Sequence, residues 1–310
     1  MFESKLNDNL KSEPNPLVSI HIVTYNQVHF IHETMNSVLS QSYENVEIIV
    51  ADDGSIDGTA EVILDYARQY PDKIIPIVGG PNLGITGNCN RGLEACKGKY
   101  ISFLGGDDLM YPDKINTQVE YMEANPICSI SYHNLDVFEH DTGKTLYLYN
   151  EKYKPYSGNV RTLIRNGCVN GGSSTMVRSE HIPLHGFDKN ITLASDWLFW
   201  IETLLNSNGT IFYINKMLGR YRRHSNNVTK VTCGGYSIGE IDHLASCMKI
   251  LFLYPKYSND ILFRLGALLR GARSARGYQA CLVASINCSI QFKTIVFLVT
   301  YFLSLKLVRL

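Results

Sequence analysis

Short apolar runs alternate with longer amphipathic stretches along the first hundred residues of the chain. Residues 18–23, 46–51 and 100–104 are mostly apolar, which is typical of short strands buried in a sheet. Between these runs, residues 31–39 and 60–67 place apolar side chains at helical spacing. This alternation predicts βαβ units. We therefore expect an α/β fold with a mostly parallel sheet and flanking helices, in which the first hundred residues form half of a nucleotide-binding fold.

Each of the three predicted strands ends in polar residues. Because the carboxyl ends of parallel strands meet at one edge of a sheet, these residues are expected to face a ligand crevice. Hard cations such as Mg²⁺ and Mn²⁺ prefer oxygen ligands, and Mg²⁺ takes only one or two protein carboxylates beside phosphates and water. The pattern indicates a divalent metal that carries a diphosphate. The three strand ends are Thr24-Tyr25-Asn26, Asp52-Asp53-Gly54-Ser55 and Gly105-Gly106-Asp107-Asp108.

The acidic turns alone also fit a purely structural role, because Asp and Gly are ordinary turn residues and Asp before a helix caps its free N–H groups. Other nucleotide-binding motifs are missing from the sequence. No Gly-x-Gly-x-x-Gly spacing follows Gly79-Gly80, and the stretch 92–99 has five residues between its glycines where a P-loop has four. No Gly-x-Ser-x-Gly elbow is present. A kinase, an ATPase and a simple α/β-hydrolase are therefore disfavoured.

The ordered motifs resemble family 2 glycosyltransferases of the bacterial surface-polysaccharide type. The resemblance covers roughly residues 16–229, and it implies a GT-A fold with a Rossmann-like, mostly parallel sheet plus a C-terminal helical appendage. The motifs that carry it are Thr24-Tyr25-Asn26, Asp52-Asp53-Gly54-Ser55, Asn82-Leu83-Gly84, Asn90-Arg91-Gly92, Asp107-Asp108, Asp196-Trp197 and Arg222-Arg223-His224.

The resemblance implies a nucleotide-sugar donor, most simply a UDP-hexose, and Mn²⁺ or Mg²⁺ as cofactor. Metal binding is expected to rest chiefly on Asp108, together with Asp107 and His224. The chain departs from the family pattern at Cys89, where an Arg is common, and at Gly105, where another Asp is common. The donor-binding residues implied in this way are Thr24, Tyr25, Asn26, Asp52, Asp53, Asn82, Gly84, Asn90, Asp107 and Arg222.

The second half of the chain is expected to bind the acceptor. By resemblance, Gly171 and Gly172 lie beside the acceptor with Trp197, and Asp196 is the general base of an inverting transfer. A base at this position takes the proton of the acceptor hydroxyl as that hydroxyl attacks the anomeric carbon. Ser195 occupies a position where the family commonly has Glu. A structural role stays open here too, since Asp196 also suits the N-terminus of a helix.

Two other classes of protein remain as alternatives. A nucleotidyltransferase also uses a metal-bearing α/β half, although residues 24–27 offer no basic, Gly-rich phosphate loop. A non-catalytic protein that binds sugar or nucleotide through a GT-A-like fold is suggested by Cys89, Gly105 and Ser195.

The composition fits a globular enzyme, with 310 residues and 45% hydrophobic content. The eight cysteines show no Cys-x-x-Cys spacing, which disfavours a structural zinc site. The polar N-terminus lacks the apolar core of a secretory signal, so reduced thiols and a cytoplasmic location are expected. The predicted regions are a flexible N-terminus (1–15), a nucleotide-sugar-binding half (16–130), an acceptor-binding and catalytic half (131–232) and a helical, basic and apolar tail (233–310).

Residues 261–310 carry seven basic residues and no acidic residue. The apolar, uncharged run of residues 294–305 in this tail is shorter than the roughly 20 residues needed to cross a bilayer. We therefore expect the tail to hold the enzyme at an anionic membrane surface, on the inner face of the plasma membrane, with packing on the catalytic domain as the alternative. The expected acceptor is a lipid-linked oligosaccharide of O-antigen or capsule synthesis, and no nucleic-acid partner is expected.

Overall fold

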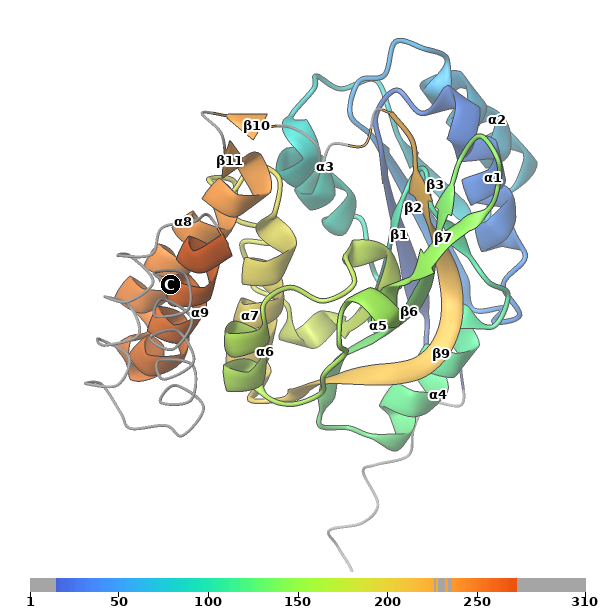
Figure 1. Cartoon of the computed structure of the whole chain (residues 1–310). Coiled ribbons are helices and arrows are strands. Elements are labelled where there is room, and N and C mark those ends of the chain that lie inside the picture. Colours follow the sequence, from blue (N-terminus) through green and yellow to red (C-terminus); the bar gives the residue numbers. More distant parts are fainter. Residues whose placement is uncertain (1–14, 226, 228–231, 234–235, 272–310) are drawn as a thin grey trace, which may run out of the picture.

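The computed structural model describes residues 15–225, 227, 232–233 and 236–271. Nine of the described strands form one sheet in the order β3-β2-β1-β4-β8-β6-β9-β5, with β7 paired to β6 (Figure 1). A small pair, β10 and β11, lies outside this sheet. The strands are β1 (Val18–Thr24), β2 (Val46–Asp52), β3 (Ile74–Ile77), β4 (Tyr100–Gly105), β5 (Leu109–Met110), β6 (Cys128–Glu139), β7 (Thr145–Leu148), β8 (Thr175–Arg178), β9 (Thr210–Arg223), β10 (Thr232–Cys233) and β11 (Tyr236–Ser237).

The first four strands of the sheet order are parallel, as the alternation of apolar runs predicts. β1 lies between β2 and β4 and pairs in parallel with both. In this register Thr24 is opposite Asp52, and Val23 is opposite Gly105. The polar ends of the three predicted strands therefore meet at one edge of the sheet.

The second half of the sheet is mixed in direction. β8 is antiparallel to both β4 and β6, whereas the long strands β6 and β9 run parallel to each other. The pairing of β6 with β9 contains bulges between His133 and Leu135, which increase local twist. β9 continues to Arg223 and pairs with β5 directly after the Asp107-Asp108 turn. One sheet thus spans both predicted halves of the chain, whose boundaries stay a prediction.

Two hydrophobic cores cover the two faces of the sheet. Alternate residues of β4 enter different cores: Tyr100 and Leu104 join the core with α1, α2 and α4, and Ile101 and Phe103 join the core with α3, α6 and α7. α8 and α9 pack outside α7 and α6 and extend the second core (Figure 1). The longer helices are α1 (Val28–Leu39), α2 (Thr59–Gln69), α3 (Gly84–Leu93), α4 (Lys114–Ala124), α6 (Val160–Asn166), α7 (Ser195–Ser207), α8 (Ile238–Leu253) and α9 (Ser258–Gly271), and the short ones are α5 (Tyr149–Lys152), η1 (Gly172–Ser174), η2 (Ser179–His181) and η4 (Pro255–Tyr257).

The predicted helical tail begins with α8 and α9, which pack on α7 and α6. Within the described part of the chain, every helix is too short or too polar to cross a membrane. The apolar run 294–305 lies outside the described residues, as do the basic residues from Arg273 to Arg309. The membrane contact expected of this region stays a prediction.

Candidate active site

The turn after β4 holds Asp107 and Asp108 in different surroundings. Asp108 is buried, and its two carboxylate oxygens accept hydrogen bonds from Ser173 Oγ and from the backbone N–H of Arg222 at 2.9 Å. Burial and the adjacent Asp107 carboxylate raise the pKa of Asp108 well above its usual value. A cation bound nearby would lower that pKa again. The turn is thus built around a carboxyl group that favours a positive neighbour.

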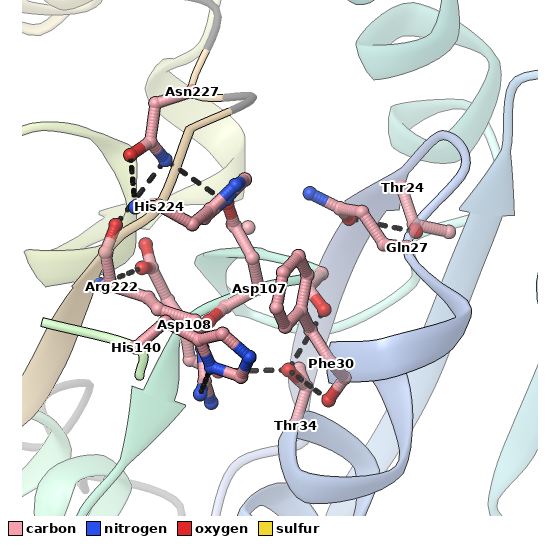
Figure 2. Close-up of polar contacts among 12 residues, drawn as sticks. Thr24, Gln27, Phe30, Thr34, Asp107, Asp108, His140, Arg222, His224 and Asn227 are labelled. Carbon is pink, nitrogen blue, oxygen red and sulfur yellow. Dashed lines mark hydrogen bonds and ion pairs between the residues drawn. The ribbon is translucent and has the colours of Figure 1, made fainter. Parts of the chain in front are cut away.

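Asp107 points instead toward the end of β9. Its Oδ2 lies 2.9 Å from His224 Nε2 and accepts a longer hydrogen bond from Asn227 Nδ2 at 3.5 Å (Figure 2). Asn227 Oδ1 in turn accepts from the backbone N–H of His224. The ring of Phe30 packs against His224 with a centroid distance of 4.5 Å and fixes its orientation. One carboxylate and one imidazole therefore face each other at this edge of the sheet.

The Arg222 side chain stabilises the Asp107-Asp108 turn. Its Nε donates to the carbonyl oxygen of Asp107 at 2.7 Å, its Nη2 pairs with Glu33 at 2.7 Å, and its Nη1 lies 3.0 Å from His140 Nδ1. The side chain is almost fully buried, at 2% exposed. The structure therefore places the Arg222 guanidinium among internal partners, and the predicted contact with donor phosphate stays a prediction.

The donor set of the turn suits a divalent cation that takes most of its ligands from a bound diphosphate. No group of three or more His, Cys, Asp or Glu side chains among the described residues is arranged to hold a metal ion. Asp107 and His224 together supply two candidate ligands, which matches the one or two protein groups typical of Mg²⁺–phosphate sites. The remaining ligands would come from the substrate and water.

The end of β2 supplies a second carboxylate, Asp53. Its Oδ1 accepts from the backbone N–H of Leu83 at 2.7 Å and lies 3.5 Å from Arg91 Nη2, whereas no described residue bonds its Oδ2. Asn82 Nδ2 donates to the carbonyl oxygen of Asp53. One oxygen of the Asp53 carboxylate, Oδ1, is thus fixed by hydrogen bonds, and the other oxygen, Oδ2, remains available to a ligand. The exposed ring of Tyr25, at the end of β1, lies at the same edge of the sheet.

Asp52 and Asn26 have internal roles in this structure. Both oxygens of Asp52 accept hydrogen bonds from Ser55, through its backbone N–H and its hydroxyl. Asn26 adopts a positive φ of 51°, and its side chain accepts from the backbone N–H of Ile56. These contacts shape the turn that presents Asp53, so a direct donor contact of Asp52 or Asn26 stays a prediction. The Thr24 hydroxyl likewise donates a hydrogen bond to Gln27 Oε1, in the turn between β1 and α1.

α3 lies between the strands β1 and β2 and the second half of the fold. Gly84, at its start, has a φ of +74°, a conformation that favours glycine. Arg91 Nη2 donates to the carbonyl oxygen of Asp52 at 2.7 Å, so its positive charge reaches the carboxyl end of β2. Asn90 is buried and exchanges two hydrogen bonds with the backbone of Phe187. The structure therefore places the Asn90 side chain on the backbone of Phe187, and its donor contact stays a prediction.

Asp196 lies in the first turn of α7, beside α3. Its Oδ1 accepts from the backbone N–H of Trp197 at 2.8 Å, and its Oδ2 accepts from the thiol of Cys168 at 3.3 Å. Burial, followed by Asp196 itself, raises the pKa of Cys168 well above its usual value, so the sulfur keeps the proton it donates. Asp196 thus supplies the negative charge in the first turn of α7, and its role as a base stays a prediction.

The predicted acceptor residues lie in two different parts of the structure. Gly171 has a φ of +82° and leads into η1, where Ser173 donates to Asp108 and accepts from the backbone N–H of Gly105. Gly172 lies in the same turn, so both glycines border the Asp107-Asp108 turn. Trp197 is fully buried in the core of α6 and α7, and in this structure it offers no surface to a sugar.

Several residues of the site escape prediction from the sequence. Phe30, Glu33 and His140 surround Arg222. Asn227 supports His224 (Figure 2). Cys168, which lies between α6 and η1, donates a hydrogen bond to Asp196. No local motif marks these residues, because each acts through a partner far away in the sequence.

Comparison with known proteins identifies related sequences. Residues 19–182 match the family described as Glycosyl transferase family 2. An uncharacterized glycosyltransferase from Nostoc sp. (strain PCC 7120) is 35% identical over 264 residues, which covers 80% of this chain and 76% of the relative. One from Rickettsia bellii is 31% identical over 227 residues, which covers 73% of this chain and 31% of the relative. The chain thus spans about a third of the length of that Rickettsia relative.

Solved structures with a similar backbone confirm the GT-A fold expected from the sequence. Staphylococcus aureus TarS, residues 1–349 in complex with UDP-GlcNAc, has a TM-score of 0.64 at 14% identity, covering 87% of this chain and 81% of TarS. A mannosyltransferase from Pyrobaculum calidifontis, in complex with GDP-Man and Mn²⁺, has a TM-score of 0.58 at 18% identity, covering 92% of this chain and 79% of that enzyme.

Proposed function

Because the chain belongs to glycosyltransferase family 2, we propose that it moves a hexose from a nucleotide sugar, with inversion, to a hydroxyl of a lipid-linked glycan. The observation that carries this proposal is the parallel register of β1, β2 and β4. That register brings Tyr25, Asp53 and the Asp107 turn to one edge of the sheet. A base, a ribose and a diphosphate can follow one another along such an edge.

The donor is proposed to be a UDP-sugar. The free oxygen of Asp53 suits the imide N–H of uracil, and the exposed ring of Tyr25 can cover the face of a base. The fold similarity to TarS, which binds UDP-GlcNAc, supports the same nucleotide. Arg91 adds a positive charge beside Asp53.

Asp107 and His224 are proposed to hold Mn²⁺ or Mg²⁺. In the sequence this role fell chiefly on Asp108, and that assignment stays a prediction; both of its oxygens accept hydrogen bonds, from Ser173 Oγ and from the backbone N–H of Arg222. These two hydrogen bonds fix the Asp108 carboxyl group and with it the position of the turn. When bound, the cation would neutralise charge that develops on the departing nucleoside diphosphate. The protein's part is to fix the turn and His224 through Arg222 and Phe30.

Asp196 is proposed as the general base that takes the proton from the acceptor hydroxyl. The Cys168 thiol and the N–H of Trp197 fix the plane of its carboxylate. The hydroxyl would then attack the anomeric carbon from the face opposite the departing nucleotide. Gly171 and Gly172 leave space at the neighbouring turn. A lipid-linked acceptor would approach along a membrane surface, and the basic residues of 261–310 suit the anionic inner face.

Substitution of Asp196 by Asn tests the proposed base. Asn keeps the shape and can still accept from Trp197, but it cannot take a proton. We expect the turnover number to fall by about 10²- to 10⁴-fold with an unchanged Kd for UDP, measured by stopped assays and calorimetry. Near-normal turnover by Asp196→Asn would remove the residue from this role. Failure of wild-type protein to transfer any sugar would favour a non-catalytic binding protein.

A further inference from the structure

We propose that the outer face of α8 docks the enzyme on an anionic membrane and thereby brings the helix that carries Asp196 to the bilayer surface. This face is formed by Ile241, Ala245, Met248 and Phe252, which are called the α8 stripe below. The proposal rests on the function proposed above, because a bilayer is where a lipid-linked acceptor is held. It names the surface of the described fold that meets the lipid.

The α8 stripe is a line of exposed apolar side chains along one side of a helix. Its members stand at positions i, i+4, i+7 and i+11 of α8, a spacing that places side chains on one face. Phe252 is 86% exposed, and Met248 is 56% exposed. Of the twelve large apolar side chains exposed in the described part of the chain, four lie on this one helix, since Leu253 extends the stripe at its end. Single exposed apolar side chains are common, whereas an aligned set marks an interaction surface.

The opposite face of α8 is occupied by the protein itself. Ser246 and Ile250 are fully buried, and Ile250 belongs to the core that contains α6 and α7. A helix that is apolar on all its sides is normally covered on all its sides. No described residue buries the stripe, so its cover is expected to come from a partner.

The inner face of α8 also holds the start of the helix that carries the proposed base. Asp242 is buried, and its Oδ2 accepts hydrogen bonds from the backbone N–H groups of Leu193 at 2.7 Å and Ala194 at 3.0 Å. These two residues lead directly into α7, whose first turn contains Asp196. One helix therefore contacts the start of α7 on one side and presents apolar side chains on the other (Figure 1). Docking of the stripe on a bilayer would fix the distance between Asp196 and the lipid surface.

Charge favours an anionic bilayer over a second copy of the chain as the partner. Residues 243–259 contain two lysines and no acidic residue, and residues 261–310 contain seven basic residues and no acidic residue. Two copies joined through this face would bring like charges together, whereas anionic headgroups attract them. A helix of 16 residues with an exposed apolar face and basic neighbours suits the boundary between lipid headgroups and acyl chains.

The experiment compares the double variant Met248→Gln/Phe252→Gln with Leu146→Gln. Leu146 is 50% exposed on β7, which lies on the opposite side of the molecule from α8 (Figure 1). The readout is the partition coefficient of the full-length protein on vesicles of phosphatidylcholine and phosphatidylglycerol, measured by sedimentation. We expect the double variant to lower this coefficient by about 10- to 100-fold, because two apolar side chains lose their burial in lipid, and Leu146→Gln to change it by less than about twofold.

Phe252→Trp provides a second measurement that leaves the stripe apolar. The natural tryptophans, Trp197 and Trp200, are fully buried, so a new indole at position 252 should be the one that meets lipid. Brominated lipid in the vesicles should quench the added fluorescence of Phe252→Trp, and it should leave the added fluorescence of Leu146→Trp unchanged.

Unchanged partition of the double variant, absence of vesicle binding by the wild-type protein, or absence of quenching in Phe252→Trp would overturn the proposal. A wild-type dimer that becomes monomeric in the double variant, with unchanged vesicle binding, would show that a second copy covers the stripe instead. Vesicle binding needs no sugar donor. If the double variant loses vesicle binding as expected but the wild-type protein transfers no sugar, the proposed function fails while the docking surface stands.

Discussion

Replacement of Arg222 by Lys tests whether the buried guanidinium positions the acidic turn. Arg222 reaches three partners in different directions: the carbonyl of Asp107, the carboxylate of Glu33 and the ring nitrogen of His140. Lys keeps the charge but concentrates it at one point on a flexible chain, so it cannot reproduce the planar fork. The substitution therefore removes geometry while the charge of the site is unchanged.

The contacts allow the size of the effect to be estimated. Loss of a hydrogen bond between a charged group and the partly buried Asp107 carbonyl costs about 1.5–3 kcal/mol. The pair with Glu33 adds little, about 0–1 kcal/mol, because the Glu33 side chain is 59% exposed. We expect Arg222→Lys to lower the free energy of unfolding by about 2–4 kcal/mol. A displaced Asp107 should lower turnover by about 10²-fold, since shifts of about 1 Å at a reacting centre have effects of that size.

Arg220→Lys is the matched control. Arg220 lies two residues earlier on the same strand, and its side chain pairs with Asp136 at 2.7 Å and donates to the carbonyl oxygen of Gly143. The assays are urea unfolding, calorimetric binding of UDP with Mn²⁺, and turnover of the UDP-sugar. Arg220→Lys should lose stability but keep UDP affinity, whereas Arg222→Lys should lose both. If Arg222→Lys binds UDP and turns over like the wild type, the guanidinium does not position the turn.

Two further predictions concern buried groups. Cys168→Ala should lower turnover by about 3- to 10-fold, because Asp196 loses a hydrogen-bond donor that fixes its carboxylate. The same change in an Asp196→Asn background should have no further effect on turnover. Equal losses of turnover in both backgrounds would contradict the pairing of Cys168 with Asp196. Burial lowers the pKa of Lys114 to about 7, so the unfolded chain binds more protons than the folded one above that pH. The free energy of unfolding should therefore rise by about 2 kcal/mol from pH 7 to pH 9, and urea titrations of Lys114→Met should lack that rise.

The strands and the carboxylates at their ends follow from local patterns. Val18–Thr24 and Val46–Asp52 are recognisable because apolar runs end abruptly in polar residues, and parallel pairing then brings those ends together without further information. Asp53 and Asp107 reach the edge of the sheet for this reason. The GT-A fold could likewise be predicted from the sequence, because the order of the motifs reflects the order of the strands.

The partners of each side chain could not be predicted in the same way. Arg222 carries the charge expected of a phosphate ligand, yet its contact with Asp107 joins positions 115 residues apart and turns the guanidinium inward. Trp197 stands next to the proposed base in sequence, but the helical turn directs it into the core. Cys168 has no motif around it, and only the docking of α7 brings its thiol to Asp196. Long-range packing decides these roles.

The central claim is that a cation held at Asp107 and His224 assists departure of a nucleoside diphosphate from a sugar. The most direct measurement is nucleotide release from a panel of UDP- and GDP-sugars after chelation, with and without added Mn²⁺ or Mg²⁺, in wild type and Asp107→Ala. We predict that release from one UDP-sugar needs the added cation, and that Asp107→Ala stays inactive with it. Full activity of the chelated wild-type enzyme, or of Asp107→Ala, would contradict this account.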